Sequence, residues 1–266
     1  MKKLSSLAVS MCMIMSLIVP SFALSSAFNT EVAFLQEYGI PSKLLDSADY
    51  DEIHNWYVYA QSGRLYYEGM TTISLYSDEG DSTILGTIPR ADMDMTIATL
   101  LFLNKNSSID FVSFVIDYKW ADGHPSIRKT DGVTVNWDPS LFYMEPNSFE
   151  SVDNCYFNGK LFKSFSFEDP THLDQGGLGY SVKLFDTPGT VFSFEGTAQF
   201  NLMPRSDLYV YKDNNKYSTS INIEYAHDKT PYVGSINFSS NSGKGVSMSL
   251  PVSADTVAHN KIIDYN

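Results

Sequence analysis

The clearest alternation of apolar and polar side chains in this chain runs from Asp110 to Trp120. From Val112 to Trp120 every second residue is apolar or aromatic, whereas the other parity is more polar and includes Ser113, Asp117 and Lys119. A period of two predicts a strand with one face in a core. The segment ADGHP then ends the strand, because Gly permits positive φ and Pro lacks a backbone donor. A second strand, residues 132–138 (GVTVNWD), is expected after this break.

Strand patterns continue through most of the remaining chain. Segments rich in β-branched and aromatic residues are separated by Asp, Asn, Gly and Pro, which is typical of antiparallel sheets. We therefore expect a mainly β protein built as an antiparallel β-sandwich, of jelly-roll or immunoglobulin-like type. Besides the two strands above, the segments are 71–77, 82–88, 95–103, 140–145, 155–168, 177–186, 190–202, 207–213, 217–226, 232–240 and 245–253.

The region before the strands, residues 28–64, has a helical period. Thr30 is expected to cap a first helix that ends at Gly39, a typical C-terminal stop. Asp49 followed by Glu52 forms a capping-box pattern at the start of a second helix. The apolar side of that helix comprises Ile53, Trp56, Tyr57 and Ala60. Together these features predict a short N-terminal α-helical hairpin, which must bury its apolar side against the next domain or a partner.

The first 27 residues have the three-part form of a secretory signal peptide. Lys2 and Lys3 precede an apolar run, and small residues follow it, so we expect cleavage after Ala23 or Ala27. No later segment is long and apolar enough to suggest a transmembrane anchor. The sequence therefore predicts a secreted, extracellular protein.

The domain boundaries follow from these patterns. The β-sandwich is expected over residues 65–254, with residues 255–266 as a C-terminal tail. Residues 145–154 (EPNSFESVDN) divide the strand-rich region into two parts, so two stacked sandwiches compete with one. We favour one unit, because this segment is short and carries Phe149, unlike a free linker.

The net charge limits the classes of binding partner, and the cysteine content limits the possible disulfides. The net charge is −13, which argues against nucleic acid and anionic surfaces as partners. Beyond the signal peptide the only cysteine is Cys155, so no intramolecular disulfide is expected. A packed structural thiol is the favoured interpretation of Cys155.

The polar loop between the two central strands is the candidate binding surface. In one interpretation it is only a connection, because Asp131-Gly132 is ordinary turn chemistry. In the other, exposed tryptophan faces stack on sugar rings while neighbouring polar groups bind hydroxyls. His227 either pairs with the adjacent Asp228 or joins this loop in space. The candidate ligand-binding residues are Trp120, Asp122, His124, Arg128, Asp131, Trp137 and His227.

Signatures of catalysis are weak. Neither a G-x-S-x-G nor an H-E-x-x-H motif occurs. Carboxylate pairs for glycoside hydrolysis need a defined separation, and the pairs to test are Asp117 with Asp131 and Glu195 with Glu224. No cofactor is expected, with Ca2+ as the one ion considered, because acidic loops supply hard oxygen ligands. The candidate Ca2+ ligands are Asp78, Glu79, Asp81, Asp92 and Asp94, although acidic loops are also commonly just solvated.

Four segments together resemble a group of uncharacterised exported proteins of Gram-positive bacteria. They are FLQEYGIPSKLLDSADYDEI (34–53), YKWADGHPSIRKTDGVTVNWD (118–138), GGLGYSVKLFD (176–186) and NIEYAHDK (222–229). The resemblance implies a secreted β-rich protein without an assigned activity, and it carries over no catalytic residue.

These observations predict a secreted, non-enzymatic binding or envelope-interaction module. Its ligand would be a cell-wall or host glycan, or an extracellular protein. One alternative is a secreted polysaccharide hydrolase. Another is a secreted antagonist or structural protein that binds through a sheet edge.

Overall fold

The computed structural model describes residues 27–73, 86–87, 93–121, 125, 130–184, 192–208, 217–228, 236–250 and 254–265. The chain divides into two compact units, Met1–Tyr67 and Glu68–Asn266, and each is described by itself. All but the last residue of the expected signal peptide lies outside the described residues. Among the described residues, no helix combines the length and apolar character needed to cross a membrane.

The first helix of the N-terminal unit covers residues 27–38. Thr30 lies inside it, so the expectation that Thr30 caps the helix is wrong, because nothing in residues 27–29 prevents a helical backbone. The expected stop at Gly39 is present, with φ at +104°. The Ile40 amide donates to the Leu35 carbonyl at 2.9 Å and the Gly39 amide to the Gln36 carbonyl at 3.1 Å. These two bonds form a Schellman motif.

A short helix, α2 (Ser42–Ser47), leads to α3 (Tyr50–Gln61), whose start is the expected capping box. The Asp49 side chain accepts from the Glu52 amide at 2.9 Å, and the Glu52 side chain accepts from the Asp49 amide at 2.9 Å. Ile53, Trp56 and Ala60 are buried. The short N-terminal helical region is therefore confirmed.

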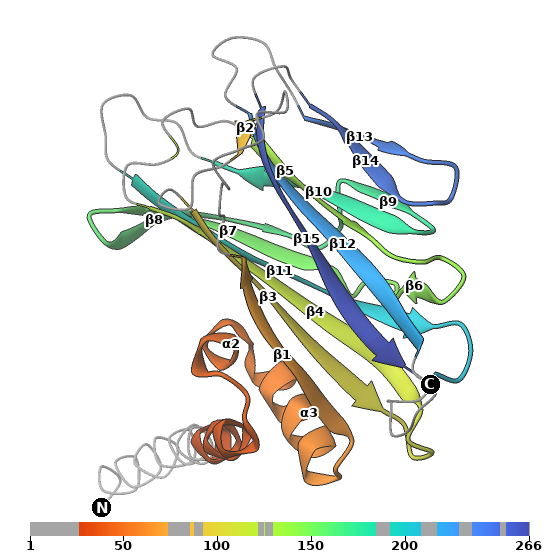
Figure 1. Ribbon diagram of the computed structural model, residues 1–266. Helices are drawn as coiled ribbons and strands as arrows, with labels where there is room; N and C mark the ends of the chain where they lie inside the picture. The colour runs from red at the N-terminus through yellow and green to blue at the C-terminus, as the bar shows by residue number, and fades with distance from the viewer. Residues whose placement is uncertain are drawn as a thin grey trace, which may run out of the picture. The chain divides into compact units, whose positions relative to one another are not determined.

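The second unit contains three sheets (Figure 1). The first has the order β1 (Leu65–Ile73), β3 (Met93–Leu103), β4 (Ile109–Trp120), β11 (Phe192–Pro204), β7 (Glu150–Phe157), β8 (Lys160–Phe167), with β6 (Phe142–Met144) pairing to β11. The second has the order β2 (Gly86–Thr87), β15 (Ala254–Tyr265), β12 (Tyr217–Asp228), β5 (Thr130–Asn136), β10 (Gly177–Lys183), β9 (His172–Asp174). The third is the hairpin β13 (Asn237–Ser240) and β14 (Val246–Ser249). The described pairings are antiparallel except that of β2 with β15.

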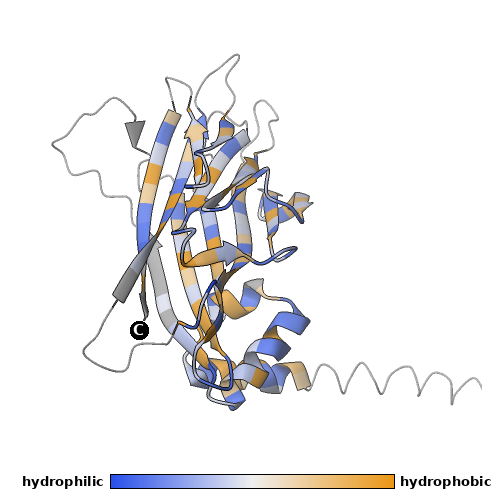
Figure 2. Cartoon of the chain, turned by 90° about the vertical axis from the view of Figure 1, so that its right-hand side faces the viewer, coloured by the Kyte–Doolittle hydropathy of each residue, from blue (hydrophilic) through white to orange (hydrophobic). Residues whose placement is uncertain are grey.

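The first two sheets share one hydrophobic core. Most of its buried side chains come from β3, β4, β7 and β11 of one sheet and from β5, β10, β12 and β15 of the other. Along β11, buried and half-buried residues alternate strictly from Phe192 to Leu202, and Figure 2 shows apolar and polar positions interspersed along the strands. The mainly β fold with antiparallel sheets is confirmed. Its jelly-roll or immunoglobulin-like type stays a prediction.

Two expected boundaries were wrong. Residues 155–168, read as one strand, form the hairpin of β7 and β8, because Asn158 and Gly159 have φ of 51° and 72°, as a tight Asn-Gly turn requires. The expected tail, residues 255–266, contains β15, which pairs with β12 along its whole length. His259 and Lys261 share the parity of the buried Val257 and Ile263, which obscures the alternation.

No division occurs at residues 145–154. Strand β11 pairs with β4, which precedes this segment, and with β7, which begins within it. The sheet is therefore continuous across the point where two sandwiches would have separated.

The hairpin β13–β14 covers the outer face of the second sheet over β5 and β10. A Cβ atom on Gly179 would lie 2.4 Å from the Phe238 ring, and one on Gly132 would lie 2.8 Å from the Ile236 side chain. The Asn136 side chain donates to the Val246 carbonyl at 3.0 Å and accepts from the Val246 amide at 2.7 Å. Glycine is therefore required where the hairpin approaches the sheet.

We expect Gly179→Ala to lower the free energy of unfolding by about 1 to 3 kcal/mol, because the added methyl group must displace the Phe238 ring. In a Phe238→Ala background the same change should cost nothing or stabilise slightly, since Ala loses less backbone entropy than Gly. Urea denaturation of the two single variants and the double variant measures this coupling. An equal cost in both backgrounds would contradict the proposed packing.

Candidate functional site

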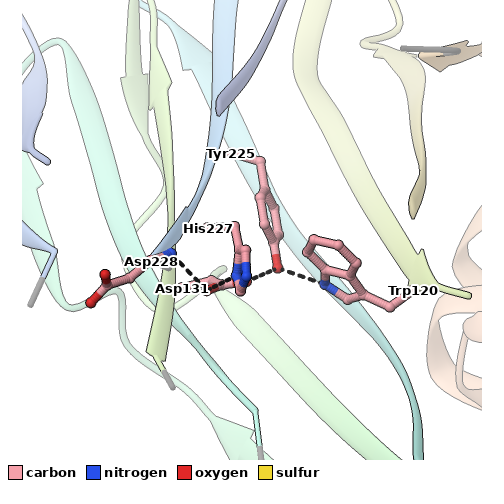
Figure 3. A network of polar contacts seen from close by, with 5 residues as sticks. All are labelled: Trp120, Asp131, Tyr225, His227 and Asp228. Atoms are coloured by element: carbon pink, nitrogen blue, oxygen red, sulfur yellow. Dashed lines mark hydrogen bonds and ion pairs between the residues drawn. The ribbon is translucent and has the colours of Figure 1, made fainter. Parts of the chain in front are cut away.

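A buried carboxylate, Asp131 on β5, is the centre of a polar network that joins the two large sheets (Figure 3). The Trp120 indole on β4 donates to the Tyr225 hydroxyl at 3.1 Å, and that hydroxyl donates to Asp131 Oδ2 at 2.7 Å. His227 Nδ1 lies 2.8 Å from Asp131 Oδ1. The Asp228 amide donates to the same oxygen at 3.3 Å. Both oxygens of Asp131 therefore have donors inside the protein.

Strand register places these groups. Strands β12 and β5 pair through Ala226 and Gly132, and one further step along the ladder sets His227 opposite Asp131. On its other side His227 pairs with Asp255 of β15. Asp131, His227 and Asp255 are 0%, 4% and 6% exposed. A carboxylate, an imidazole and a second carboxylate thus form a buried row across three adjacent strands.

A second network lies beside the first. The Tyr118 hydroxyl on β4 donates to Asp153 Oδ1 on β7 at 2.8 Å, and the Lys183 amide on β10 donates to Asp153 Oδ2 at 2.7 Å. The strand between β4 and β7 places Gly196 opposite both Tyr118 and Asp153. A Cβ atom on Gly196 would lie 2.4 Å from the Tyr118 hydroxyl. The glycine therefore leaves room for the Tyr118 ring to cross β11 and reach Asp153.

Burial controls the protonation of both carboxylates. It raises the pKa of Asp131, partly opposed by the hydrogen bond and charge of His227. It raises the pKa of Asp153 to about 6, partly opposed by the Lys183 amide and the Tyr118 hydroxyl. Burial also raises the pKa of Tyr118 and of Tyr225 well above the ordinary range, and their neighbouring carboxylates add to this. Both tyrosines thus remain neutral donors to the carboxylates.

The first network is suited to holding strands together. A general base must lie within hydrogen-bond reach of a substrate proton, but His227 and Asp131 are almost wholly buried. The His227 ring also packs edge-on against Trp120, with centroids 5.0 Å apart. In this structure, therefore, the His–Asp pair is closed to a substrate.

The structure brings three of the predicted site residues together, namely Trp120, Asp131 and His227. Trp137 lies six residues beyond Asp131, about 20 Å away along an extended strand. The Trp120 and Trp137 rings are 2% and 4% exposed, which corrects the expectation that their faces stack on sugars. Their indole nitrogens bind Tyr225 and the Gln175 carbonyl. Asp122, His124 and Arg128 lie outside the described residues.

The local partner considered for His227 was also wrong. Its ring binds Asp131, not the adjacent Asp228, because consecutive strand residues point to opposite faces. Four residues of these networks were not predicted from the sequence as site residues, namely Tyr118, Asp153, Tyr225 and Asp255. The sequence pattern could have indicated Tyr225, because this residue shares the apolar parity of β12 with Ile221, Ile223 and His227.

The expected ion and carboxylate sites receive no support from the described residues. Asp94 is exposed on β3, and the other candidate Ca2+ ligands, Asp78, Glu79, Asp81 and Asp92, lie outside the described residues. Where side chains are described, no group of three or more His, Cys, Asp or Glu could hold a metal ion.

The carboxylate pairs considered for hydrolysis are divided between the two sheets. Asp117 and Glu195 belong to the first sheet, where they bind Thr197 and Lys119. Asp131 and Glu224 belong to the second sheet, and Glu224 has the strand parity opposite to the buried Tyr225. Cys155 is 1% exposed within the core, which agrees with a packed structural thiol.

We expect Tyr225→Phe to lower the free energy of unfolding by about 1 to 3 kcal/mol, because it leaves the buried Trp120 donor and Asp131 acceptor without their partner. Tyr180→Phe is the matched control, since the buried Tyr180 hydroxyl has no hydrogen-bond partner among the described residues. That substitution should be neutral or stabilising. Chemical denaturation of both variants makes the comparison, and equal losses would contradict a specific role for Tyr225.

Asp153 should make stability depend on pH. Its pKa is about 6 in the folded protein and 3.8 ordinarily, so between these values the folded state binds more protons than the unfolded state. The free energy of unfolding should therefore contain a component that falls as pH rises from 4 to 6, by up to about 3 kcal/mol. Asp153→Asn should remove this component while keeping one acceptor. Denaturation of both proteins from pH 4 to 8 tests this, and parallel profiles would contradict it.

Comparison of the chain with protein-family models and with curated proteins finds no match in either case.

Proposed function

We propose that this protein is a secreted, non-enzymatic binding module whose ligand is an extracellular protein. The observation that carries the proposal is the burial of the His227–Asp131 pair. Asp131 binds Tyr225, His227 and the Asp228 amide. Side chains that are buried and hydrogen-bonded in this way stabilise the fold, so ligand binding falls to side chains on the surface.

Three exposed large hydrophobic residues of the second unit supply such a surface. Phe157, Leu161 and Phe162 gather at the β7–β8 hairpin and are 39%, 58% and 55% exposed. Phe157 and Phe162 both pack against the buried Phe192, with ring centroids 5.6 and 5.7 Å apart. This support holds the exposed rings in place. Exposed apolar patches of this kind commonly mark protein interaction sites.

The glycan and hydrolase alternatives have less support. Glycan binding was expected to use the Trp120 and Trp137 faces, which are buried. Hydrolysis was expected to use carboxylate pairs whose members belong to different sheets. The signal-peptide pattern and the resemblance to exported proteins of Gram-positive bacteria support the secreted destination.

Site-specific photocrosslinking in the producing cells tests the proposal. A photoreactive amino acid at Leu161 should give a discrete adduct with another protein, because that side chain lies in the apolar surface. The same group at Asn222, an exposed polar position on β12, is the matched control. Equal adducts at both positions, or none at Leu161, would count against a protein-binding hairpin.

A parallel assay addresses the glycan alternatives. The protein is incubated with purified peptidoglycan and insoluble polysaccharides, and pelleted protein and released sugar are measured together. We expect neither. Released sugar would replace the proposal with a hydrolase, and pelleting without release would replace the protein ligand with a glycan.

A further inference from the structure

Strand β8 is the end strand of the first sheet. Its inner edge pairs with β7 from Lys160 to Phe167, and no described strand pairs with its outer edge. An end strand presents backbone donors and acceptors along its outer edge, which another chain can use. The eight residues of β8 are long enough for an added strand of ordinary length.

The side chains of β8 give this edge an apolar face. Phe165 lies opposite Asp153 and Phe167 lies opposite Ser151 in the ladder, so both phenylalanines are on the face that points to the core. Both remain half-buried at the end of the sheet, and Phe162 is more exposed. A strand added beside β8 would cover the remaining surface of these rings.

Charge distinguishes this edge from the rest of the molecule. The chain carries a net charge of −13, but residues 155–167 contain Lys160 and Lys163 and no acidic residue. Both lysines are exposed, and the Lys163 ammonium lies 4.6 Å from the centre of the Phe165 ring. Glu168 and Asp169 follow the strand at its other end. The edge is therefore basic at its start and acidic beyond its end.

The same lysines disfavour self-association. Lysine on an edge strand is a common device against edge-to-edge pairing of identical chains. Two β8 strands paired in parallel and in register would also bring four lysines together at one end. A partner with carboxylates in these positions would instead be attracted.

We propose that the outer edge of β8 binds an extended, acidic and apolar segment of a protein partner by strand addition. The inference rests on the proposed protein-binding function and deepens it. The bound segment alternates apolar residues, which cover Phe162, Phe165 and Phe167, with polar ones. Its carboxylates lie at the end that meets Lys160 and Lys163, and backbone hydrogen bonds to β8 supply the pairing.

Selection from a library of random ten-residue peptides against the full protein tests the partner chemistry. Enriched peptides should alternate apolar residues and concentrate Asp and Glu at one end. The Lys160→Glu/Lys163→Glu variant should lose this acidic preference, and its affinity for the best peptide should fall at least tenfold. The Lys105→Glu/Lys244→Glu variant, altered at exposed turn positions by the same charge, should retain both. Absence of enrichment, or an equal loss in both variants, would overturn the proposal.

Backbone methylation of the best peptide tests the pairing itself. N-methyl groups on every second residue remove the donors from one edge of an extended peptide. One of the two alternating patterns should abolish binding and the other should preserve it. Equal binding of both methylated peptides would show that side chains alone are recognised, which overturns strand addition.

The two proposals can fail separately. A discrete photocrosslink at Leu161 together with peptides that ignore the lysines would leave the protein-binding function standing and remove strand addition at β8. Absence of the photocrosslink from producing cells would remove the binding function itself, whatever the peptide selection gives.

Discussion

Burying the carboxylates of Asp131 and Asp153 between two sheets is the constraint on which the centre of this fold depends. An ionised or neutral carboxyl group in a core needs donors for its oxygens, or its desolvation opposes folding. Tyr118, Tyr225, His227 and the Lys183 amide supply these donors. The bond from the Lys183 amide to Asp153 runs from one sheet to the other, as does the bond from the Trp120 indole to the Tyr225 hydroxyl. The polar groups therefore specify how the sheets face each other, which a purely apolar interface would leave less defined.

Glycine makes these contacts geometrically possible. Gly196 lets the Tyr118 ring cross a neighbouring strand inside the core, and Gly132 and Gly179 let the β13–β14 hairpin approach the outer face of the second sheet. In each case the missing side chain is replaced by the ring or side chain of a distant residue. A β-sheet that holds large aromatic side chains at such short range needs these gaps, because protein interiors are close-packed.

The two large sheets differ in which of their surfaces are covered and which are exposed. The β13–β14 hairpin covers the outer face of the second sheet over β5 and β10, whereas the first sheet ends in β8, which has the exposed Phe162, two half-buried phenylalanines and two lysines. The few buried polar groups stabilise the interior, and exposed apolar side chains lie at the β7–β8 hairpin. This arrangement agrees with the proposed binding surface at β8, away from the closed His–Asp pair.

The class of the fold and the local start and stop signals of its elements follow from the amino-acid sequence alone. Strand alternation, the Asp49 capping box and the Gly39 stop depend on residues within a few positions of one another, so they could be predicted directly. Only the tertiary structure decided that β15 completes the second sheet, that Trp120 and Trp137 are buried, and that His227 binds Asp131 across 96 positions of the chain. Those outcomes depend on which strands pair and in which register, and long-range pairing leaves no trace in the spacing of neighbouring residues.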